Sequence, residues 1–122
     1  MFIQFSSYNH PISSVDLNDT NDILLLKTNL YTYRFVAIGD CCSVSQFKKF
    51  KDVEFSSVIG KIIKGVKEIH EEFEYDENDN DECITPHLYE MSFKNSEETF
   101  KFLMVNYSNG FYDGWINSSV VF

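Results

Sequence analysis

The stretch that decides the expected fold is residues 35–47, Phe35-Val36-Ala37-Ile38-Gly39-Asp40-Cys41-Cys42-Ser43-Val44-Ser45-Gln46-Phe47. A strand should end at Gly39, because residues 31–38 alternate in the period of two that suits a strand, and Gly39 with Asp40 suits a turn. Ser43 and Gln46 have the spacing of a capping box, which predicts a helix over about 44–51. The stretch is therefore expected to pass from a strand into a helix.

The two adjacent cysteines would lie immediately before that helix, where the helix N-terminus lowers the pKa of a thiol. A thiol nucleophile needs a base and an orienting group, and if the site were catalytic, Cys42 would have His87 or His70 as base and Asp40 as orienter. The commoner reading is that small cysteines pack in the core. We predict no catalytic residue, and enzyme activity remains the less favoured alternative.

The same cysteines enter a candidate metal site. Cys41 or Cys42 would join Cys83 and His87, the last two in a Cys-x-x-x-His spacing. Structural zinc sites usually show two well-spaced pairs of ligands, and adjacent cysteines rarely bind one ion together. No metal and no cofactor is predicted, although these four residues are the ones that would hold zinc.

Composition indicates one folded domain spanning 1–122, since the chain is 43% hydrophobic and 16% aromatic. The net charge of −9 is concentrated in residues 71–82, which hold eight acidic residues and no basic one, so 74–86 is predicted to be a mobile acidic loop. The rest of the chain is nearly neutral. This distribution disfavours a DNA mimic, and no basic surface for nucleic acid is present.

No apolar run is long enough to span a membrane, and the N-terminus lacks the features of a signal peptide. Three cysteines, two of them adjacent, do not form a disulfide framework. We therefore expect an intracellular protein that is not secreted and has no membrane partner.

Along the chain, residues 1–22 are predicted to be an N-terminal extension that begins with an edge strand at 1–5. Strands are predicted at 23–27, 31–38, 89–93, 99–107 and 115–122, with a hairpin connection at 94–98. Residues 58–73 also fit a helical stripe, but Gly60, Gly65 and the β-branched residues favour a strand over about 61–72. The predicted fold is α+β, a mainly antiparallel sheet with one short helix.

The segment 106–115, Asn-Tyr-Ser-Asn-Gly-Phe-Tyr-Asp-Gly-Trp, is the better candidate for contact with a ligand or partner. It presents polar groups and aromatic faces around two glycines. The residues predicted to bind are Asn106, Ser108, Asn109, Tyr112 and Trp115. The structural alternative is a bulged hairpin with Tyr112 and Trp115 in the core.

Two motifs together resemble those of an uncharacterised family of small phage, plasmid and large-DNA-virus proteins. Residues 39–43 match its Gly-Asp-Cys-Cys-Ser motif, with Phe47 and 59–60 following. Residues 106–114 are similar to its Asn-x-Ser-Asn-Gly-Tyr-Tyr-x-Gly ending, with Phe111 where Tyr is usual and Asp113 in a position that is commonly Gly. The resemblance covers roughly 23–117, implies a giant-virus member, favours the strand at 61–72, and brings no catalytic residue with it.

The functional prediction is a small intracellular viral protein, in the host cytoplasm or the virion, that acts by protein–protein contact. A homodimer is expected because free strand edges and aromatic residues favour self-association. The acidic loop would meet a basic protein partner. The alternatives are a cysteine-dependent or zinc-assisted enzyme centred on Cys41 and Cys42, and an acidic DNA-mimic inhibitor of a host protein.

Overall fold

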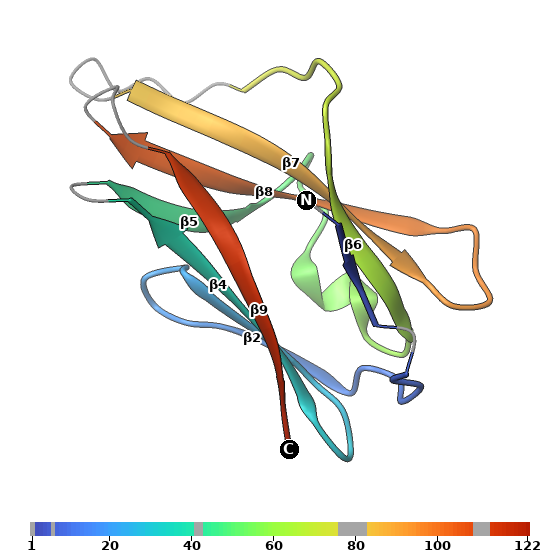
Figure 1. Ribbon diagram of the computed structural model, residues 1–122. Coiled ribbons are helices and arrows are strands. Elements are labelled where there is room, and N and C mark those ends of the chain that lie inside the picture. The colour runs from blue at the N-terminus through green and yellow to red at the C-terminus, as the bar shows by residue number, and fades with distance from the viewer. Residues whose placement is uncertain (1, 6, 41–42, 76–82, 109–112) are drawn as a thin grey trace.

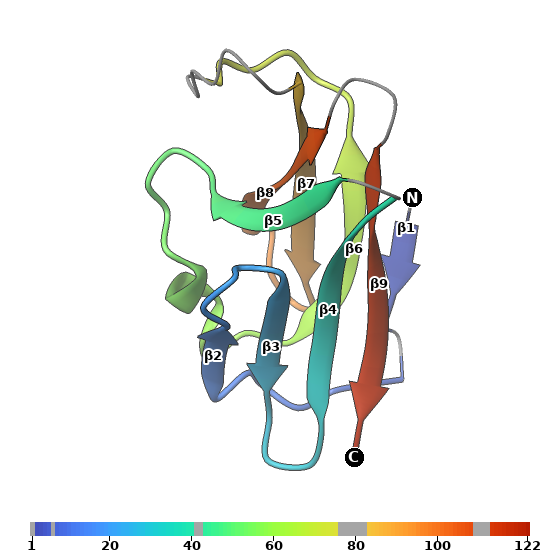
Figure 2. The same ribbon diagram turned by 90° about the vertical axis from the view of Figure 1, so that its left-hand side faces the viewer.

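In the computed structural model, which describes residues 2–5, 7–40, 43–75, 83–108 and 113–122, two antiparallel sheets pack face to face (Figures 1 and 2). The five-stranded sheet has the order β1-β6-β7-β8-β5 and the four-stranded sheet the order β2-β3-β4-β9. The strands are β1 Phe2–Gln4, β2 Ser14–Leu17, β3 Ile23–Lys27, β4 Thr32–Gly39, β5 Val44–Lys49, β6 Ile63–Ile69, β7 Cys83–Phe93, β8 Thr99–Ser108 and β9 Gly114–Val121. The helical structure of the described residues is one short 3₁₀ turn, η1, at Phe55–Val58.

The prediction of an α+β fold with a helix at 44–51 is wrong. Residues 44–49 form β5, which pairs with β8 from Val44 opposite Tyr107 to Lys49 opposite Phe102. Ser45 and Phe47 are buried, while their neighbours Val44, Gln46 and Lys48 are exposed or half-buried, which is the period of a strand. The Ser43 hydroxyl donates to the carbonyl oxygen of Asp40 (2.6 Å) in a turn between the sheets. Pairing with β8 therefore overrides the local helix signal.

The strand predicted at 61–72 is confirmed, with the shorter bounds Ile63–Ile69. The predicted N-terminal extension contains β1, an edge strand as expected, and also β2, which the sequence analysis missed. The predicted acidic loop is too long at its C-terminal end, because β7 begins at Cys83. Residues 76–82, where mobility is predicted, lie outside the described residues.

The core lies between the two sheets and is rich in aromatic side chains. Strand β4 contributes Tyr33 and Phe35, which are fully buried, and β8 contributes Phe102 and Met104 from the opposite sheet. Phe102 stacks on Tyr89 of β7, with ring centroids 5.6 Å apart. The alternation predicted for residues 31–38 thus places one face of β4 in the core.

A second, smaller cluster covers the outer face of the five-stranded sheet. Leu88, Leu103 and Val105 are buried there because the segment that follows β6 folds back over the sheet. Phe73 of this segment meets Phe50 edge to face, with centroids 5.9 Å apart. Both faces of β8 are consequently buried over much of its length.

Candidate functional site

The two sequence motifs meet at one end of the sandwich. Gly39 at the end of β4 pairs with Gly114 at the start of β9, and the Asp40 amide donates to the carbonyl oxygen of Asp113 (2.9 Å). From Asp40 the chain crosses to the other sheet and enters β5, so this corner joins the two sheets. Residues more than 60 positions apart in the sequence therefore form one cluster.

Asn106 holds this corner from inside. Its side chain is fully buried, and its Nδ2 donates to Ser45 Oγ (2.9 Å) and Ser43 Oγ (3.2 Å). Ser45 Oγ in turn donates to the carbonyl oxygen of Ile38 (3.0 Å). The other amide atom, Asn106 Oδ1, is buried without a hydrogen-bond partner in the described part of the chain. An unpaired buried acceptor costs free energy, so the bonds made by Nδ2 have to offset this cost.

Both glycines of the corner leave no room for a side chain. A Cβ on Gly114 would lie 2.6 Å from the carbonyl oxygen of Ile38 and would collide with Ser45 Oγ. A Cβ on Gly39 would lie 2.5 Å from the carbonyl oxygen of Ser43. These motif positions are thus explained by close packing of β4, β5 and β9.

A group of charged side chains at the same end connects the sheets. His87 of β7 contacts two carboxylates. Its Nε2 lies 2.8 Å from Oδ1 of Asp113, the residue before β9, and its Nδ1 lies 3.6 Å from Oε2 of Glu68 in β6. The exposed His70 lies on the other side of Glu68, with Nδ1 3.7 Å from the same oxygen. His87 therefore bridges a carboxylate of each sheet.

The local field changes the pKa of two members of this group. Burial raises the pKa of Asp113, but hydrogen bonds from His87 and from the Gly114 amide outweigh it, so the net pKa is lowered. Burial, assisted by the nearby Glu68 carboxylate, raises the pKa of the Tyr89 hydroxyl, which donates to Glu68 Oε1 (3.3 Å). Asp113 thus favours its ionised form and Tyr89 its neutral form.

The predicted catalytic and metal sites are only partly described. Asp40 and His87 both contact Asp113, Asp40 through its backbone amide and His87 through its ring, whereas Cys41 and Cys42 lie outside the described residues. The helix N-terminus expected to lower the pKa of the two thiols does not exist, because residues 44–49 are a strand. Cysteine chemistry here stays a prediction.

For the metal site, Cys83 and His87 both lie on β7, about 13 Å apart along an extended strand. In the described residues, no group of three or more His, Cys, Asp and Glu side chains is arranged to hold a metal ion.

The predicted partner-binding residues divide between the interior and the surface. Asn106 and Ser108 are buried, and Asn109 and Tyr112 lie outside the described residues. Trp115 is 44% exposed, which contradicts the alternative that placed it in the core. It pairs with Ile38 on the outer face of the four-stranded sheet.

The free edge of β9 is a further candidate contact surface that the predicted binding residues do not include. In an antiparallel ladder, successive residues direct their backbone groups alternately to either side. The Ala37 amide donates to the carbonyl oxygen of Asp22, on the β3 side of β4. The backbone N–H and C=O groups of the even-numbered residues of β4 therefore point toward β9. In the pairing of β4 with β9, the backbone groups of Ile116, Ser118 and Val120 consequently point away from the sheet. The signal was present, because residues 114–122 contain no charged side chain.

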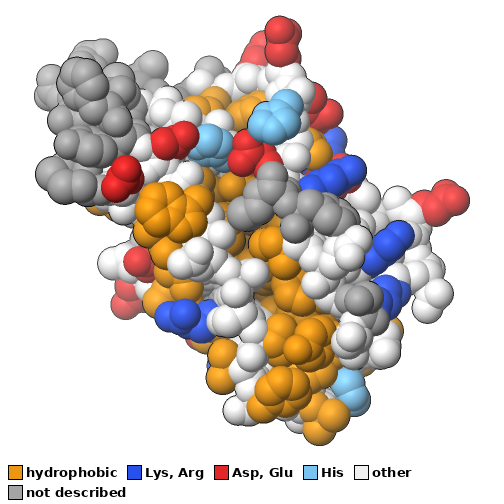
Figure 3. All heavy atoms as spheres, viewed as in Figure 1, with side chains coloured by type: hydrophobic (Ala, Val, Ile, Leu, Met, Phe, Trp, Pro, Cys, Tyr) orange, Lys and Arg blue, Asp and Glu red, His pale blue; other side chains and the backbone are white. Residues whose placement is uncertain are grey.

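The surface around β9 is apolar toward the C-terminus. Figure 3 shows hydrophobic side chains gathered along the face on which β9 lies in front, with most charged groups around its margin. Phe122 is 86% exposed and Val121 50% exposed, and the Phe122 ring lies 5.8 Å from that of Tyr31. This face is a candidate contact surface.

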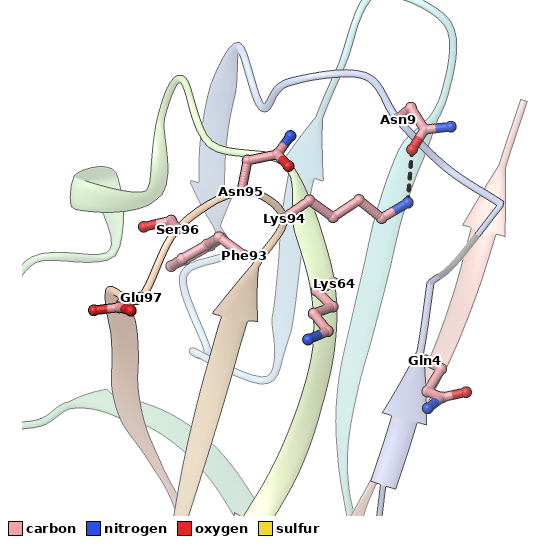
Figure 4. Close-up of a pocket in the computed structure, with 8 residues that line it drawn as sticks. All are labelled: Gln4, Asn9, Lys64, Phe93, Lys94, Asn95, Ser96 and Glu97. Atoms are coloured by element: carbon pink, nitrogen blue, oxygen red, sulfur yellow. Dashed lines mark hydrogen bonds between the residues drawn. The ribbon is translucent and has the colours of Figure 1, made fainter.

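An open hollow of about 770 Å³ lies between the β7–β8 connection and the N-terminal segment (Figure 4). Its Lys94 extends to Asn9 Oδ1 (2.7 Å) and also donates to the carbonyl oxygen of Tyr8 (3.0 Å). Because the Lys94 ammonium is already engaged by oxygen acceptors, the hollow does not resemble a prepared anion site.

The chain is similar to an uncharacterised protein of Acanthamoeba polyphaga mimivirus, 35% identical over 107 residues. The match covers 86% of this chain and 83% of that protein. No family model matches, and no solved structure matches. In the described residues, no helix is long and apolar enough to cross a membrane.

Proposed function

We propose that this protein acts by protein–protein contact and that a strand of its partner pairs with the free edge of β9. The chain belongs to the same family as the uncharacterised mimivirus protein. The observation that carries the proposal is the contrast among the four sheet edges. An exposed strand edge is a template for pairing, and proteins protect such edges with short strands, charged residues or proline.

Three of the four edges are protected in this way. Strand β1 has three residues, and β2 has four, including Asp16. Strand β5 has six residues and ends with Lys48 and Lys49. Strand β9 has eight residues, no charged residue and no proline. It is the edge suited to addition of a strand from a partner, which is a common mode of recognition.

In this proposal the motif residues hold the corner from which β9 starts. Asn106, Ser45 and Gly114 position the first residue of the strand against β4 and β5. The intracellular setting, the membership of a wider phage and plasmid family, and a basic partner for the acidic segment 71–82 are further parts of the proposal. Replacing the acidic residues of that segment with Asn and Gln should release such a basic partner.

Ser118→Lys tests the proposed edge, because lysine on an edge strand opposes pairing. Tagged wild-type and variant proteins would be recovered from cells that produce them, with partners quantified by mass spectrometry and a second tag to detect self-association. We expect at least one stoichiometric partner, the chain itself included, to be lost from the variant. Ser56→Lys is the matched control, because Ser56 is exposed in η1 and its substitution adds the same charge. Identical partners for wild type and Ser118→Lys would overturn the proposal.

A further inference from the structure

We infer that the strand accepted by β9 is β9 of a second copy, paired antiparallel about a two-fold axis at Ser118. The inference rests on the proposed function and names its partner. It joins two four-stranded sheets into one continuous sheet of order β2-β3-β4-β9-β9-β4-β3-β2.

The backbone groups match in this register. A two-fold axis at Ser118 places Ile116 opposite Val120 of the second copy and Ser118 opposite itself. These three residues are the ones whose N–H and C=O groups point away from β4. Each copy therefore presents three donors to three acceptors of the other, as a hydrogen-bonded antiparallel ladder requires.

The side chains match as well. On the outer face, Trp115 meets Val121 of the second copy, an aromatic and β-branched pair of the kind that stabilises sheets. Asn117 meets Ser119, so two polar side chains lie opposite each other. On the inner face, Ile116 meets Val120. Each cross-strand pair joins side chains of the same character.

β9 itself brings no like charges together at this contact, although each chain carries a net charge of −9. The nearest charged residue to β9 in the sequence is Asp113, which precedes the strand. Antiparallel pairing about Ser118 separates the two Asp113 residues by ten strand positions, or about 33 Å. That distance exceeds the Debye length of about 8–10 Å in physiological salt. β9 is thus an uncharged strand on which two copies can meet without placing charged side chains of β9 opposite each other.

A second copy fits this edge better than an unrelated strand for a geometric reason. A two-fold contact is self-complementary, so one sequence has to satisfy both sides. Residues 115–121 do so about Ser118, where each large apolar residue faces another apolar residue. Moving the axis to Ile116, which shifts the register by four residues, would leave Val120 and Val121 beyond the other strand.

The test measures the mass of the purified chain from about 1 to 100 µM by native mass spectrometry and light scattering. Wild type should be a dimer at the upper end of this range. Ser118→Lys places two ammonium groups opposite each other on the axis and should weaken the dimer at least tenfold. Ser56→Lys should leave the dimer unchanged, and circular dichroism would confirm that both variants keep the fold.

A charge pair tests the register itself. In Asn117→Lys with Ser119→Glu, each lysine faces a glutamate of the second copy, twice per dimer, so the Kd should stay equal or fall. Asn117→Lys with Ser119→Lys places like charges opposite each other and should dissociate the dimer. All four positions are exposed on the outer face of β9 in the two copies.

The inference is overturned if wild type is monomeric at 100 µM, or if both charge pairs act alike. If the purified chain is monomeric but Ser118→Lys still loses a different protein from cells, the homodimer is wrong and the proposed function stands. If Ser118→Lys changes neither the mass nor the recovered partners, the proposed function fails with it.

Discussion

Gly114→Ala offers the sharpest test of the corner that joins the two sheets. The new Cβ would lie 2.6 Å from the Ile38 carbonyl oxygen and 2.9 Å from Asn106 Nδ2, and closer still to Ser45 Oγ. Carbon atoms do not tolerate such distances, so β9 has to move away from β4 and β5, or Ser45 has to leave its place. The Ile38 carbonyl belongs to the backbone of a paired strand and cannot rotate aside.

The expected cost can be worked from these contacts. Overpacking a tight site costs about 1–3 kcal/mol. Displacing Ser45 also breaks its bonds to Ile38 and Asn106, at about 0.5–1.5 kcal/mol each. We expect Gly114→Ala to lower the free energy of unfolding by about 2–6 kcal/mol, which corresponds to a Tm lower by roughly 8–24 °C in a domain of this size.

Urea and thermal unfolding followed by circular dichroism would measure the loss. Gly60→Ala is the matched control, because a Cβ there meets nothing within 4 Å and suffers only from the φ of +89°. Its cost should be about 1–2 kcal/mol. Ser45→Ala removes the closest clash, so the Gly114→Ala and Ser45→Ala costs should be less than additive by at least about 1 kcal/mol. Additive costs, or a Gly114→Ala loss below that of Gly60→Ala, would refute the reasoning.

Three further outcomes are expected. Because the folded-state pKa of Asp113 is lowered, its bond to His87 stabilises fully above the ordinary value of 3.8 and is lost as pH falls through the folded pKa. Asp113→Asn should therefore be less stable than wild type at pH 7, with the difference closing below about pH 3.8 in urea titrations. Phe73→Ala should cost about 1–2 kcal/mol of unfolding free energy, since Phe73 is half-buried against Phe50; an unchanged urea midpoint would show that this segment does not cover the sheet. Burial raises the pKa of Tyr89 above the ordinary value of 10.0, so an ultraviolet titration compared with Tyr89→Phe should find that Tyr89 ionises at a pH above that value while the chain stays folded.

The strands that alternate clearly could be predicted from the sequence. Residues 31–38 and 99–107 carry aromatic or apolar residues in strand-like runs, and both are strands close to the expected bounds. The hairpin connection at 94–98 is also where it was expected, between Phe93 and Thr99. In these segments the local pattern and the tertiary environment agree, which is why a local argument succeeds.

The segment 44–51 shows where such an argument fails. The Ser43 to Gln46 spacing is compatible with a helix cap, but Ser45 and Phe47 are buried, and β8 pairs with the segment from Val44 to Lys49. That pairing joins residues about 60 positions apart. A pattern within four residues cannot report it, so the α+β prediction was wrong.

The candidate site divides in the same way. By itself the sequence determined which residues are unusual: the 39–43 and 106–115 motifs, the acidic segment 71–82, and an uncharged C-terminal run. Only the tertiary structure decided that Asn106 and Gly114 are packed into a corner while Trp115 faces outward. It also decided that β9 is an edge strand. The physical reason is that burial and strand order depend on which segments pair across the fold, and that pairing is a property of the whole chain.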